Sequence, residues 1–428
     1  MTIAISLARR GRITVVILIT ACLLIGVSAV RFSQPAFVGV PKVLTDFDAF
    51  HIAGGLAATG RLDEAYDADT FLIEQQKVSG VKSFMPWTYP PPFSAVVQVL
   101  SYLPIGVSYA LFTGLSFTFY LLVLRCIAGD YLPGVLIAIA PILVINLRTG
   151  QNGFLIAGLI GAFLVALMSA RNKRAGALLG LMIIKPHLAV SVGLLALWQR
   201  SFALLAVAAI VVATLVGVAS WLYGFAVWKA FAMALRQATG FLELGYYPLF
   251  RMSSVYATLF SLGAGPRIAI VGQALCAIAA LAVFVLALVK GTTARYRSAL
   301  ACAAAVMVSP YCYDYDLTIL GLALAFVIPD ILLRASNLEV GMVMALGWIV
   351  GGYGLMVAIF MEKVLDSNAS GVVLGAQPLT PTLIAPTLLI LYYFIALILR
   401  RNPLRVSTDG LAALGSFQER MGQEQCRQ

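Results

Sequence analysis

The sequence predicts an all-α polytopic membrane protein. Of its 428 residues, 61% are hydrophobic and only 11% are charged, and the mean hydropathy is +0.96. Soluble domains carry about 25% charged residues, so this composition excludes a soluble protein. The apolar residues form repeated runs of about 20, the length that a helix needs to cross the hydrocarbon core of a bilayer. These runs do not alternate in polarity as the strands of a membrane β-barrel do, which favours helices.

The charge distribution and the missing motifs exclude several classes of function. The net charge of +11 comes from basic residues that flank the apolar runs, where the positive-inside rule places them, so it does not indicate nucleic-acid binding. The six cysteines include no CxxC pair, which leaves no signal for a metal site or a disulfide framework. No P-loop, dinucleotide fingerprint or HExxH motif occurs, which argues against an ATP-driven pump.

The N-terminal region combines a basic flank with a long apolar run. "ARRGR" precedes an apolar stretch over residues 13–30. A signal peptide would share this pattern, but no small-x-small cleavage site follows the run, so we expect an uncleaved first helix. Residues 1–12 are then cytoplasmic, and residues 31–92 form an outer loop, which is the only long acid-rich stretch of the chain.

Short helices are expected within this first outer loop. Cap and stop residues mark their ends. The motif "WTYPPPF" follows, and its three consecutive prolines predict an extended chain, with residues 93–103 forming a helix at the membrane interface. The two expected loop helices are 47–59, with Asp46 or Thr45 as the cap and Gly60 as the end, and 68–78, with Asp67 as the cap and Gly80 as the end.

The rest of the chain predicts a membrane domain over residues 13–400, with a second outer loop at 223–266 and a cytoplasmic tail at 401–428. Residues 175–199 are apolar but contain "KPH", so we expect two short helices there and ten spans in total, or twelve if both short helices count. No internal repeat is visible, which weakens a transporter built from duplicated halves. The remaining spans are expected at 106–127, 131–147, 152–170, 202–222, 267–290, 297–309, 314–334, 339–361 and 380–400.

Two aspartates open the first outer loop helix, and we treat them as candidates for chemistry. Asp46 and Asp48 are two residues apart and point about 200° apart on a helix, so only one of them can face a given substrate. The other would be a cap or solvated. His51 shares a face with Asp48. The alternative is that Asp46 caps the helix and that Asp48 and His51 form a surface pair.

Two further polar motifs interrupt the apolar runs. "RTGQNG" places the donors Arg148, Gln151 and Asn152 at the outer edge of the membrane, unless it is only a polar hairpin with an interfacial anchor. "KPH" places Lys185 and His187 within an apolar run, where ionisable groups are costly and indicate function by default. A lipid phosphate would offset the cost of burying Lys185. A snorkelling lysine is the alternative.

The other outer segments and "WTYPPPF" add four candidate residues. "SPYCYDYD" places Asp314 and Asp316 at the start of a span, where one aspartate would complement the helix dipole and the tyrosines would suit an interfacial belt. Arg251, in "YYPLFRMSS", is a candidate ligand for phosphate or sugar, or part of an interfacial aromatic–arginine cluster. Tyr89, in "WTYPPPF", is a further candidate substrate contact.

Taken in order, these motifs resemble glycosyltransferase family 87, a family of the GT-C superfamily that contains bacterial polyprenol-phosphate-mannose-dependent α-mannosyltransferases. The resemblance runs from about residue 13 to residue 400. Relatives often have a histidine just before "Asp-Tyr-Asp", where this chain has Tyr313, which leaves the role of Asp314 open. The motifs that carry the resemblance are the early aspartate in "DFDAF", then "AYDADTF", "YPPPF", a Leu-Pro stretch, "GQNG", "KPH" and "SPYCYDYD".

The resemblance implies a GT-C-type fold of about 10–12 spans and a sugar transfer. The donor would be a polyprenyl-phosphate sugar, with mannose as the first choice, and the acceptor a lipid or glycan. Asp46 occupies the place of the family's general base, with Asp48 as the runner-up. Cations such as Lys185, Arg148 and Arg251, together with His187, would stabilise the departing lipid phosphate. One carboxylate suffices for a single displacement with inversion, so no metal or other cofactor is expected.

The same resemblance implies a location in the bacterial inner membrane, with both termini cytoplasmic and the active site on the outer face. Two rival functions remain. A lipid or solute transporter or flippase would use Lys185 and His187 as a midplane site and would move its substrate without covalent change. A scaffold that binds lipid-linked sugar would carry out no chemistry, and substitution of Asp46 would leave its function intact.

Overall fold

A computed structural model describes residues 7–34, 44–80, 85–364 and 381–403. The cytoplasmic tail expected at 401–428 lies largely outside these residues. Within them the chain is helical, and the β pairing consists of one isolated antiparallel bridge between Met252 and Tyr313. In chain order the helices are α1 (Leu7–Ser33), α2 (Asp46–Ala58), α3 (Leu62–Tyr66), α4 (Ala68–Ser79), α5 (Pro91–Ser101), α6 (Ile105–Ala128), η2 (Gly129–Tyr131), α7 (Leu132–Ala138), α8 (Ala140–Thr149), α9 (Gly153–Met168), α10 (Asn172–Leu181), η3 (Met182–Ile184), η4 (Pro186–Ala189), α11 (Val190–Trp198), α12 (Phe202–Tyr223), α13 (Ala226–Glu243), η5 (Leu249–Arg251), α14 (Val255–Ser261), α15 (Pro266–Val289), α16 (Ala294–Val308), η6 (Asp314–Leu317), α17 (Thr318–Arg334), α18 (Asn337–Val364) and α19 (Ile384–Leu399), where η marks a 3₁₀ helix.

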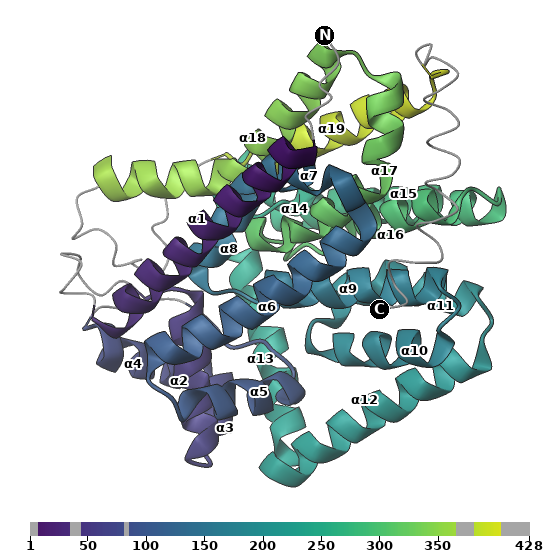
Figure 1. Cartoon of the computed structure of the whole chain (residues 1–428). Helices are drawn as coiled ribbons and strands as arrows, with labels where there is room; N and C mark the ends of the chain where they lie inside the picture. Colours follow the sequence, from purple (N-terminus) through teal and green to yellow (C-terminus); the bar gives the residue numbers. More distant parts are fainter. Residues whose placement is uncertain (1–6, 35–43, 81–84, 365–380, 404–428) are drawn as a thin grey trace.

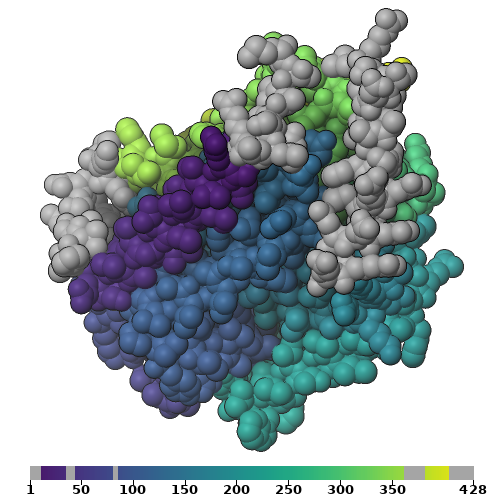
Figure 2. Space-filling model, in the orientation of Figure 1, coloured from purple at the N-terminus to yellow at the C-terminus, as the bar shows by residue number. Residues whose placement is uncertain are grey.

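The chain is an all-α, multi-pass membrane protein. Helix α1 lies along α6 at the surface of the molecule (Figures 1 and 2), and large apolar side chains such as Leu115 and Phe202 are exposed, as lipid-facing residues are. Four shorter apolar helices accompany the long ones, and the total of ten to twelve spans stays a prediction. Within the described residues, the six stretches long and apolar enough to cross a membrane are Gly11–Ser33, Ile105–Ala138, Phe202–Tyr223, Pro266–Val289, Asp314–Arg334 and Asn337–Phe360.

Two of the expected membrane segments are interrupted and do not form continuous helices. The span expected at 131–147 is broken in two, because α7 ends at Ala138 and α8 restarts with Pro141, which has no N–H to continue the helix. The segment 175–199 forms two short helices, α10 and α11, as expected. The two 3₁₀ turns between them meet at Lys185, whose φ of −149° and ψ of 66° interrupt the helical path.

The stretch predicted as the first outer loop contains the two predicted helices and corrects one detail. Helix α2 begins after Thr45, and α4 begins after Asp67, whose carboxylate accepts a hydrogen bond from the Thr70 backbone N–H. The short helix α3 between them was not predicted. The expectation that all three prolines hold the chain extended was wrong, because Pro91 and Pro92 open α5. The first turn of a helix needs no N–H donors, so prolines fit there.

An aromatic cluster fixes α2 and α5 onto α6. Phe50 of α2 packs edge-on against Trp87, Phe93 and Phe112 at ring distances of 5.2–6.0 Å. Gly54 of α2 lies so close to the backbone of α5 that an added Cβ would overlap the Val97 carbonyl. Figure 1 shows α2–α5 gathered at one end of the molecule, beside the end of α1 and the start of α6. Most of "WTYPPPF" is therefore core packing.

The stretch predicted as the second outer loop contains an amphipathic helix that was not predicted. In α13 the buried residues Val227, Ala234 and Ala238 recur at helical spacing, while the opposite face is exposed. This buried face packs on α3, where the rings of Tyr66 and Phe231 meet at 5.8 Å. The loop therefore covers the first outer loop and then returns the chain to η5.

Arg295 fastens the end of α17 opposite to η6. Pro329 lies inside α17 and cannot donate to the carbonyl of Ala325, four residues earlier. The Arg295 guanidinium donates to that carbonyl at 3.1 Å, to Phe326 O at 3.1 Å and to Ile127 O of α6 at 3.3 Å. One partly buried cation thus satisfies a carbonyl freed by the proline and ties α17 to α6.

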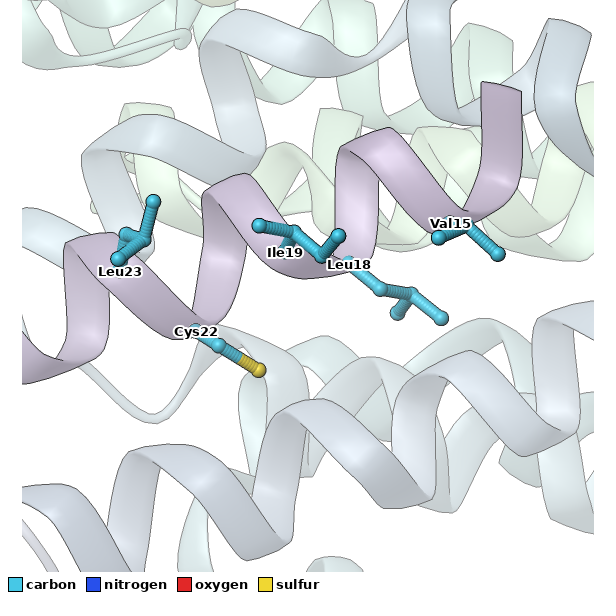
Figure 3. Close-up of a pocket in the computed structure, with 5 residues that line it drawn as sticks. All are labelled: Val15, Leu18, Ile19, Cys22 and Leu23. Carbon is cyan, nitrogen blue, oxygen red and sulfur yellow. The ribbon is translucent and has the colours of Figure 1, made fainter. Parts of the chain in front are cut away.

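A shallow recess on α1 offers no groups for chemistry. It is lined by Val15, Leu18, Ile19, Cys22 and Leu23 (Figure 3). Apart from one thiol these side chains are hydrocarbon, on a helix whose surface is mostly exposed. The recess suits contact with lipid chains, and the polar groups that could act on a substrate lie elsewhere.

Candidate active site

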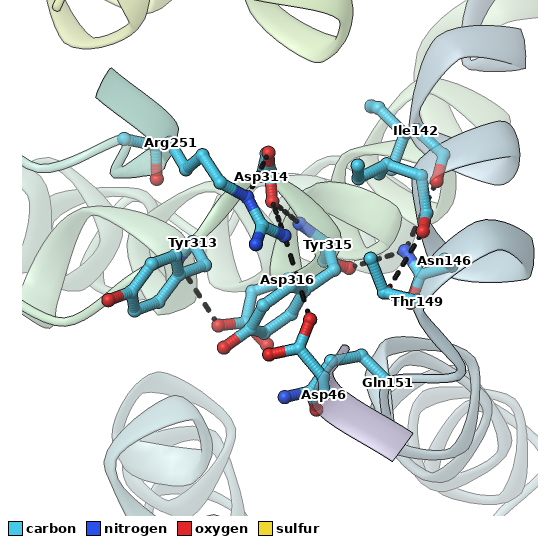
Figure 4. A network of polar contacts seen from close by, with 12 residues as sticks. Asp46, Ile142, Asn146, Thr149, Gln151, Arg251, Tyr313, Asp314, Tyr315 and Asp316 are labelled. Carbon is cyan, nitrogen blue, oxygen red and sulfur yellow. Dashed lines mark hydrogen bonds and ion pairs between the residues drawn. The ribbon is translucent and has the colours of Figure 1, made fainter. Parts of the chain in front are cut away.

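Charged and polar side chains from five distant segments meet at the start of α2. They come from the start of α2, from η5, from η6, from the turn between α8 and α9, and from the junction of η3 and η4. Ion pairs and hydrogen bonds link them. Figure 4 shows the part of this network in which Arg251 lies between Asp314 and Asp46. The residues at the centre are Asp46, Asn152, Lys185, Arg251, Asp314 and Asp316, with Tyr313 and Tyr315 beneath the two cations.

Arg251 lies between two carboxylates. Its Nε and Nη2 donate to Asp314 Oδ2 and Oδ1, each at 3.1 Å, which is a bidentate pair. Its Nη2 lies 3.8 Å from Asp46 Oδ2. Burial alone would lower the pKa of the Arg251 guanidinium, but the carboxylates of Asp314 and Asp46 outweigh burial and hold that pKa above its usual range. Arg251 is therefore a permanent cation, engaged closely by one aspartate and loosely by the other.

Lys185 and Asp316 form a second, deeper pair. Lys185 Nζ donates to Asp316 Oδ1 at 2.6 Å, and the two side chains are 7% and 0% exposed. Nζ also lies 3.5 Å from Asn152 Oδ1 and 4.9 Å from the centre of the Tyr315 ring. The lysine predicted from "KPH" thus has a carboxylate partner in the chain itself, and it does not snorkel to the surface.

Segment η6, which carries both aspartates, is fixed by its neighbours on α8 and α9. Asn146 Nδ2 donates to the Tyr315 carbonyl at 2.9 Å, and Thr318 Oγ1 donates to the Gly153 carbonyl at 3.0 Å. An added Cβ on Gly153 would overlap the Tyr315 carbonyl. On the other side, the backbone bridge between Met252 and Tyr313 joins η6 to the segment of Arg251. The positions of Asp314 and Asp316 are therefore set by backbone contacts.

Two stacked tyrosines form a platform under the cations. The rings of Tyr313 and Tyr315 lie 5.2 Å apart and within 8° of parallel. The Arg251 guanidinium carbon lies 5.9 Å and 5.7 Å from their centres, which is cation–π distance. Tyr313 thus occupies the position just before "Asp-Tyr-Asp", where it contributes an aromatic face to the site.

The two aspartates of α2 have different surroundings. Asp48 is buried, and its Oδ2 accepts hydrogen bonds from the Thr45 backbone N–H at 2.8 Å and from the Thr45 hydroxyl at 3.3 Å, which is a capping box. Asp46 lies at the first turn, is 19% exposed and faces Arg251. As expected, the two point in different directions, and Asp46 is the one that faces the cluster.

The remaining predicted residues fall into two groups. Tyr89 and Gln151 join the cluster's edge, because the Tyr89 hydroxyl donates to Gln151 Oε1 at 3.0 Å, and burial raises the pKa of Tyr89 to about 12 so that this proton stays in place. The second group contains His51, His187 and Arg148, of which His187 lies close enough to Lys185 to interact with it electrostatically. His51 Nε2 bonds the Leu103 carbonyl at 3.0 Å, His187 Nε2 is buried, and Arg148 lies at the end of α8, partly exposed.

Gly354 of α18 is a site-shaping residue that the sequence analysis missed. A Cβ there would lie 2.6 Å from Asp314 Oδ2 and 3.2 Å from Arg251 Cα, so the α18 backbone presses directly on the ion pair. The motif "GGYG" within an apolar span is a signal for such close packing. Asn146, a buried amide in an apolar stretch, was a second usable signal.

The charges in this cluster do not balance. Three carboxylates, those of Asp46, Asp314 and Asp316, face the two cations Arg251 and Lys185. In the described part of the chain no three His, Cys, Asp or Glu side chains are arranged to hold a metal ion. Two carboxylates are closely paired and fully buried. Asp46 is the partly exposed carboxylate of the three.

Comparison with known proteins adds one match. The sequence model of glycosyltransferase family 87 matches residues 87–310, just over half of the 428-residue chain. The matched region contains Tyr89, Lys185 and Arg251, while Asp46 and the η6 aspartates lie outside it. No curated protein and no solved structure matches the chain.

Proposed function

The chain belongs to glycosyltransferase family 87, and from this membership we propose that it transfers a sugar from a polyprenyl-phosphate donor to a hydroxyl group of a lipid or glycan acceptor, with Asp46 as the general base. The observation that carries the proposal is the difference in exposure and in ion pairing among the three carboxylates. Asp314 and Asp316 are fully buried and closely paired with cations, whereas Asp46 is 19% exposed and 3.8 Å from Arg251. A general base needs access to its substrate and a lone pair that is not already engaged.

The reaction is a single displacement. The acceptor oxygen attacks the anomeric carbon of the sugar, and the bond from that carbon to the phosphate oxygen breaks. The acceptor proton passes to Asp46, and the polyprenyl phosphate departs with the bonding electron pair. One displacement inverts the anomeric configuration and needs only one carboxylate.

Arg251 is the cation best placed to stabilise the departing phosphate. Asp314 occupies the Nε–Nη2 edge of the guanidinium, and a guanidinium has a second edge with further N–H donors. Lys185 is enclosed by Asp316 and is only 7% exposed, so its predicted contact with phosphate requires a rearrangement. Arg148, at the end of α8, is the second partly exposed cation of this region. Tyr313 and Tyr315 offer aromatic faces on which a sugar ring can stack.

The direction of α17 supports a site on the outer face. The span that begins at Asp314 ends at Arg334, which donates to the Arg401 carbonyl next to Arg400. Basic residues mark the cytoplasmic ends of membrane helices. With Arg334 and Arg400 on the cytoplasmic side, the cluster around Asp314 faces outward, and a donor anchored in the bilayer can reach it. From the family we further propose a location in a bacterial inner membrane, a GT-C-type fold and a hexose, mannose first, as the transferred sugar.

The test is a transfer assay with purified protein in detergent or in membranes. A panel of radiolabelled polyprenyl-phosphate sugars is offered together with an envelope extract that supplies acceptors. We expect wild-type protein to move label from one donor, and Asp46→Asn to be slower by about 10² to 10⁴-fold, the range that a general base contributes. The matched control is Asp69→Asn, the same change at an exposed position in the first turn of α4, which keeps full activity.

Two outcomes would count against the proposal. Transfer by Asp46→Asn at the wild-type rate removes Asp46 from the role of base. No transfer from any donor by folded wild-type protein, with label instead moving across sealed vesicles unchanged, favours a transporter. A donor other than the mannose derivative changes the sugar and leaves the mechanism in place.

A further inference from the structure

Arg251 faces the proposed base, Asp46. It also lies 3.1 Å from a second carboxylate, that of Asp314, which is fully buried. Two carboxylates share one guanidinium in this arrangement. Asp314 holds it through two short hydrogen bonds, and Asp46 lies at 3.8 Å. A bidentate, buried pair is the stronger of the two interactions, so Asp314 decides where the guanidinium lies.

Several contacts hold Asp314 itself in place. Its Oδ1 accepts a hydrogen bond from the Tyr315 backbone N–H at 2.9 Å, and its side chain is 0% exposed. Helix α18 closes over the pair at Gly354, which leaves no room for a side chain. The stacked rings of Tyr313 and Tyr315 lie beneath the guanidinium. These contacts fix the position of the Asp314 carboxylate, and its two hydrogen bonds to Arg251 in turn fix the guanidinium.

We infer that Asp314 is a positioning residue, which binds Nε and Nη2 of Arg251 and so holds Nη2 at 3.8 Å from Asp46 without letting the guanidinium close on that carboxylate. This inference rests on the proposed role of Asp46 as the base. If Asp314 were neutral, Asp46 would be the remaining close counter-ion of Arg251, and the guanidinium would move onto it. A carboxylate in a tight bidentate pair has its lone pairs engaged and accepts a proton from an acceptor hydroxyl less readily. Asp314 therefore keeps the base available and keeps Arg251 in place for the departing phosphate.

The first test is a double-mutant cycle on kcat. We expect Asp314→Asn to lower kcat about 10²-fold, the loss that a misplacement of about 1 Å causes, without changing the KM for the donor. In an Arg251→Gln background the same Asp314→Asn change has no further effect, because the cation that it releases is absent. The Arg251→Gln/Asp314→Asn double variant removes both buried charges, which avoids an unpaired ion in the core. An equal fall in kcat in both backgrounds, or a raised KM, would mean that Asp314 contacts the substrate directly and would overturn the inference.

The second test leaves every charge in place. Gly354→Ala adds a methyl group 2.6 Å from Asp314 Oδ2, so the carboxylate must shift. We expect a fall in kcat with an unchanged KM. The matched control is Gly347→Ala, two turns earlier on α18, where the added Cβ would make an ordinary contact at 3.5 Å and activity is retained. Wild-type kcat in folded Gly354→Ala would overturn the inference.

Asp46→Asn, measured in the same assay, distinguishes failure of the proposed base from failure of the positioning role of Asp314. Full activity of Asp46→Asn defeats the proposed function, whatever Asp314 does. An inactive Asp46→Asn together with a fully active Asp314→Asn defeats only the positioning role and leaves the base in place.

Discussion

The buried pair of Lys185 and Asp316 gives the sharpest prediction about stability. The two charged atoms lie 2.6 Å apart, with side chains 7% and 0% exposed. Coulomb's law with an effective dielectric constant of about 20 gives roughly 6 kcal/mol of attraction at that distance, before the cost of removing both ions from water is subtracted. Replacing one partner forfeits that attraction and leaves the other ion buried alone, which destabilises proteins by about 3–5 kcal/mol.

We therefore expect Lys185→Met and Asp316→Leu each to lower the free energy of unfolding by about 3–5 kcal/mol, while the double variant lies within about 1 kcal/mol of wild type. The measurement is equilibrium unfolding of the purified protein in mixed detergent micelles, followed by tryptophan fluorescence. The matched control is Lys77→Met, which breaks an exposed pair with Glu74 and has an expected effect below about 1 kcal/mol.

Additive losses in the double variant would refute this reasoning, because they would show that the two charges do not depend on each other. The same variant also tests the phosphate role of Lys185. Since its ammonium group is already engaged by Asp316, we expect the double variant to bind donor with the wild-type KM. A raised KM in a stable double variant would instead make Lys185 a ligand of the donor.

Two further predictions concern contacts outside the charged cluster. Asp48→Ala removes the capping box of α2 and should lower the free energy of unfolding by about 1 kcal/mol. The rate of sugar transfer per folded molecule should be unchanged. Loss of transfer at full stability would make Asp48 the base. Arg295→Met leaves three carbonyls without their donor and should destabilise by about 3 kcal/mol. Adding Pro329→Ala should recover about 1 kcal/mol, since the new N–H can reach the Ala325 carbonyl, and no recovery would contradict that account.

Local signals in the sequence predicted the outer-loop helices well. Asp67 and Gly80 are a cap and a stop whose effect depends only on the nearest few residues, and α4 begins and ends beside them. The prediction from the three prolines was wrong for a related reason. Three prolines look the same in sequence whether they precede a helix or form its first turn. Only the packing of α5 against α2 decides between the two, and that packing joins residues about forty positions apart.

The candidate residues were predictable as a set, but their partners were not. Lys185, Arg251, Asp314 and Asp316 stand out because charges are rare in apolar runs. Nothing in their spacing tells that Lys185 pairs with Asp316, 131 residues later, or that Arg251 pairs with Asp314. A predicted phosphate ligand and a structural counter-ion look alike in sequence. Gly354 was missed because its role lies in an absent side chain.

The wide separation of the paired charges has a consequence for biosynthesis. Lys185 and Arg251 leave the ribosome well before residues 314–316, which supply their counter-ions. Until then, neither cation can settle at its buried position without an isolated charge in a low-dielectric environment. The two cations can therefore reach their final positions only after η6 has been synthesised. A nascent chain that stops before η6 lacks Asp314, the counter-ion of Arg251. A ribosome-stalled series ending on either side of residue 316 would show protease-resistant packing of the outer segments only in the longer chains.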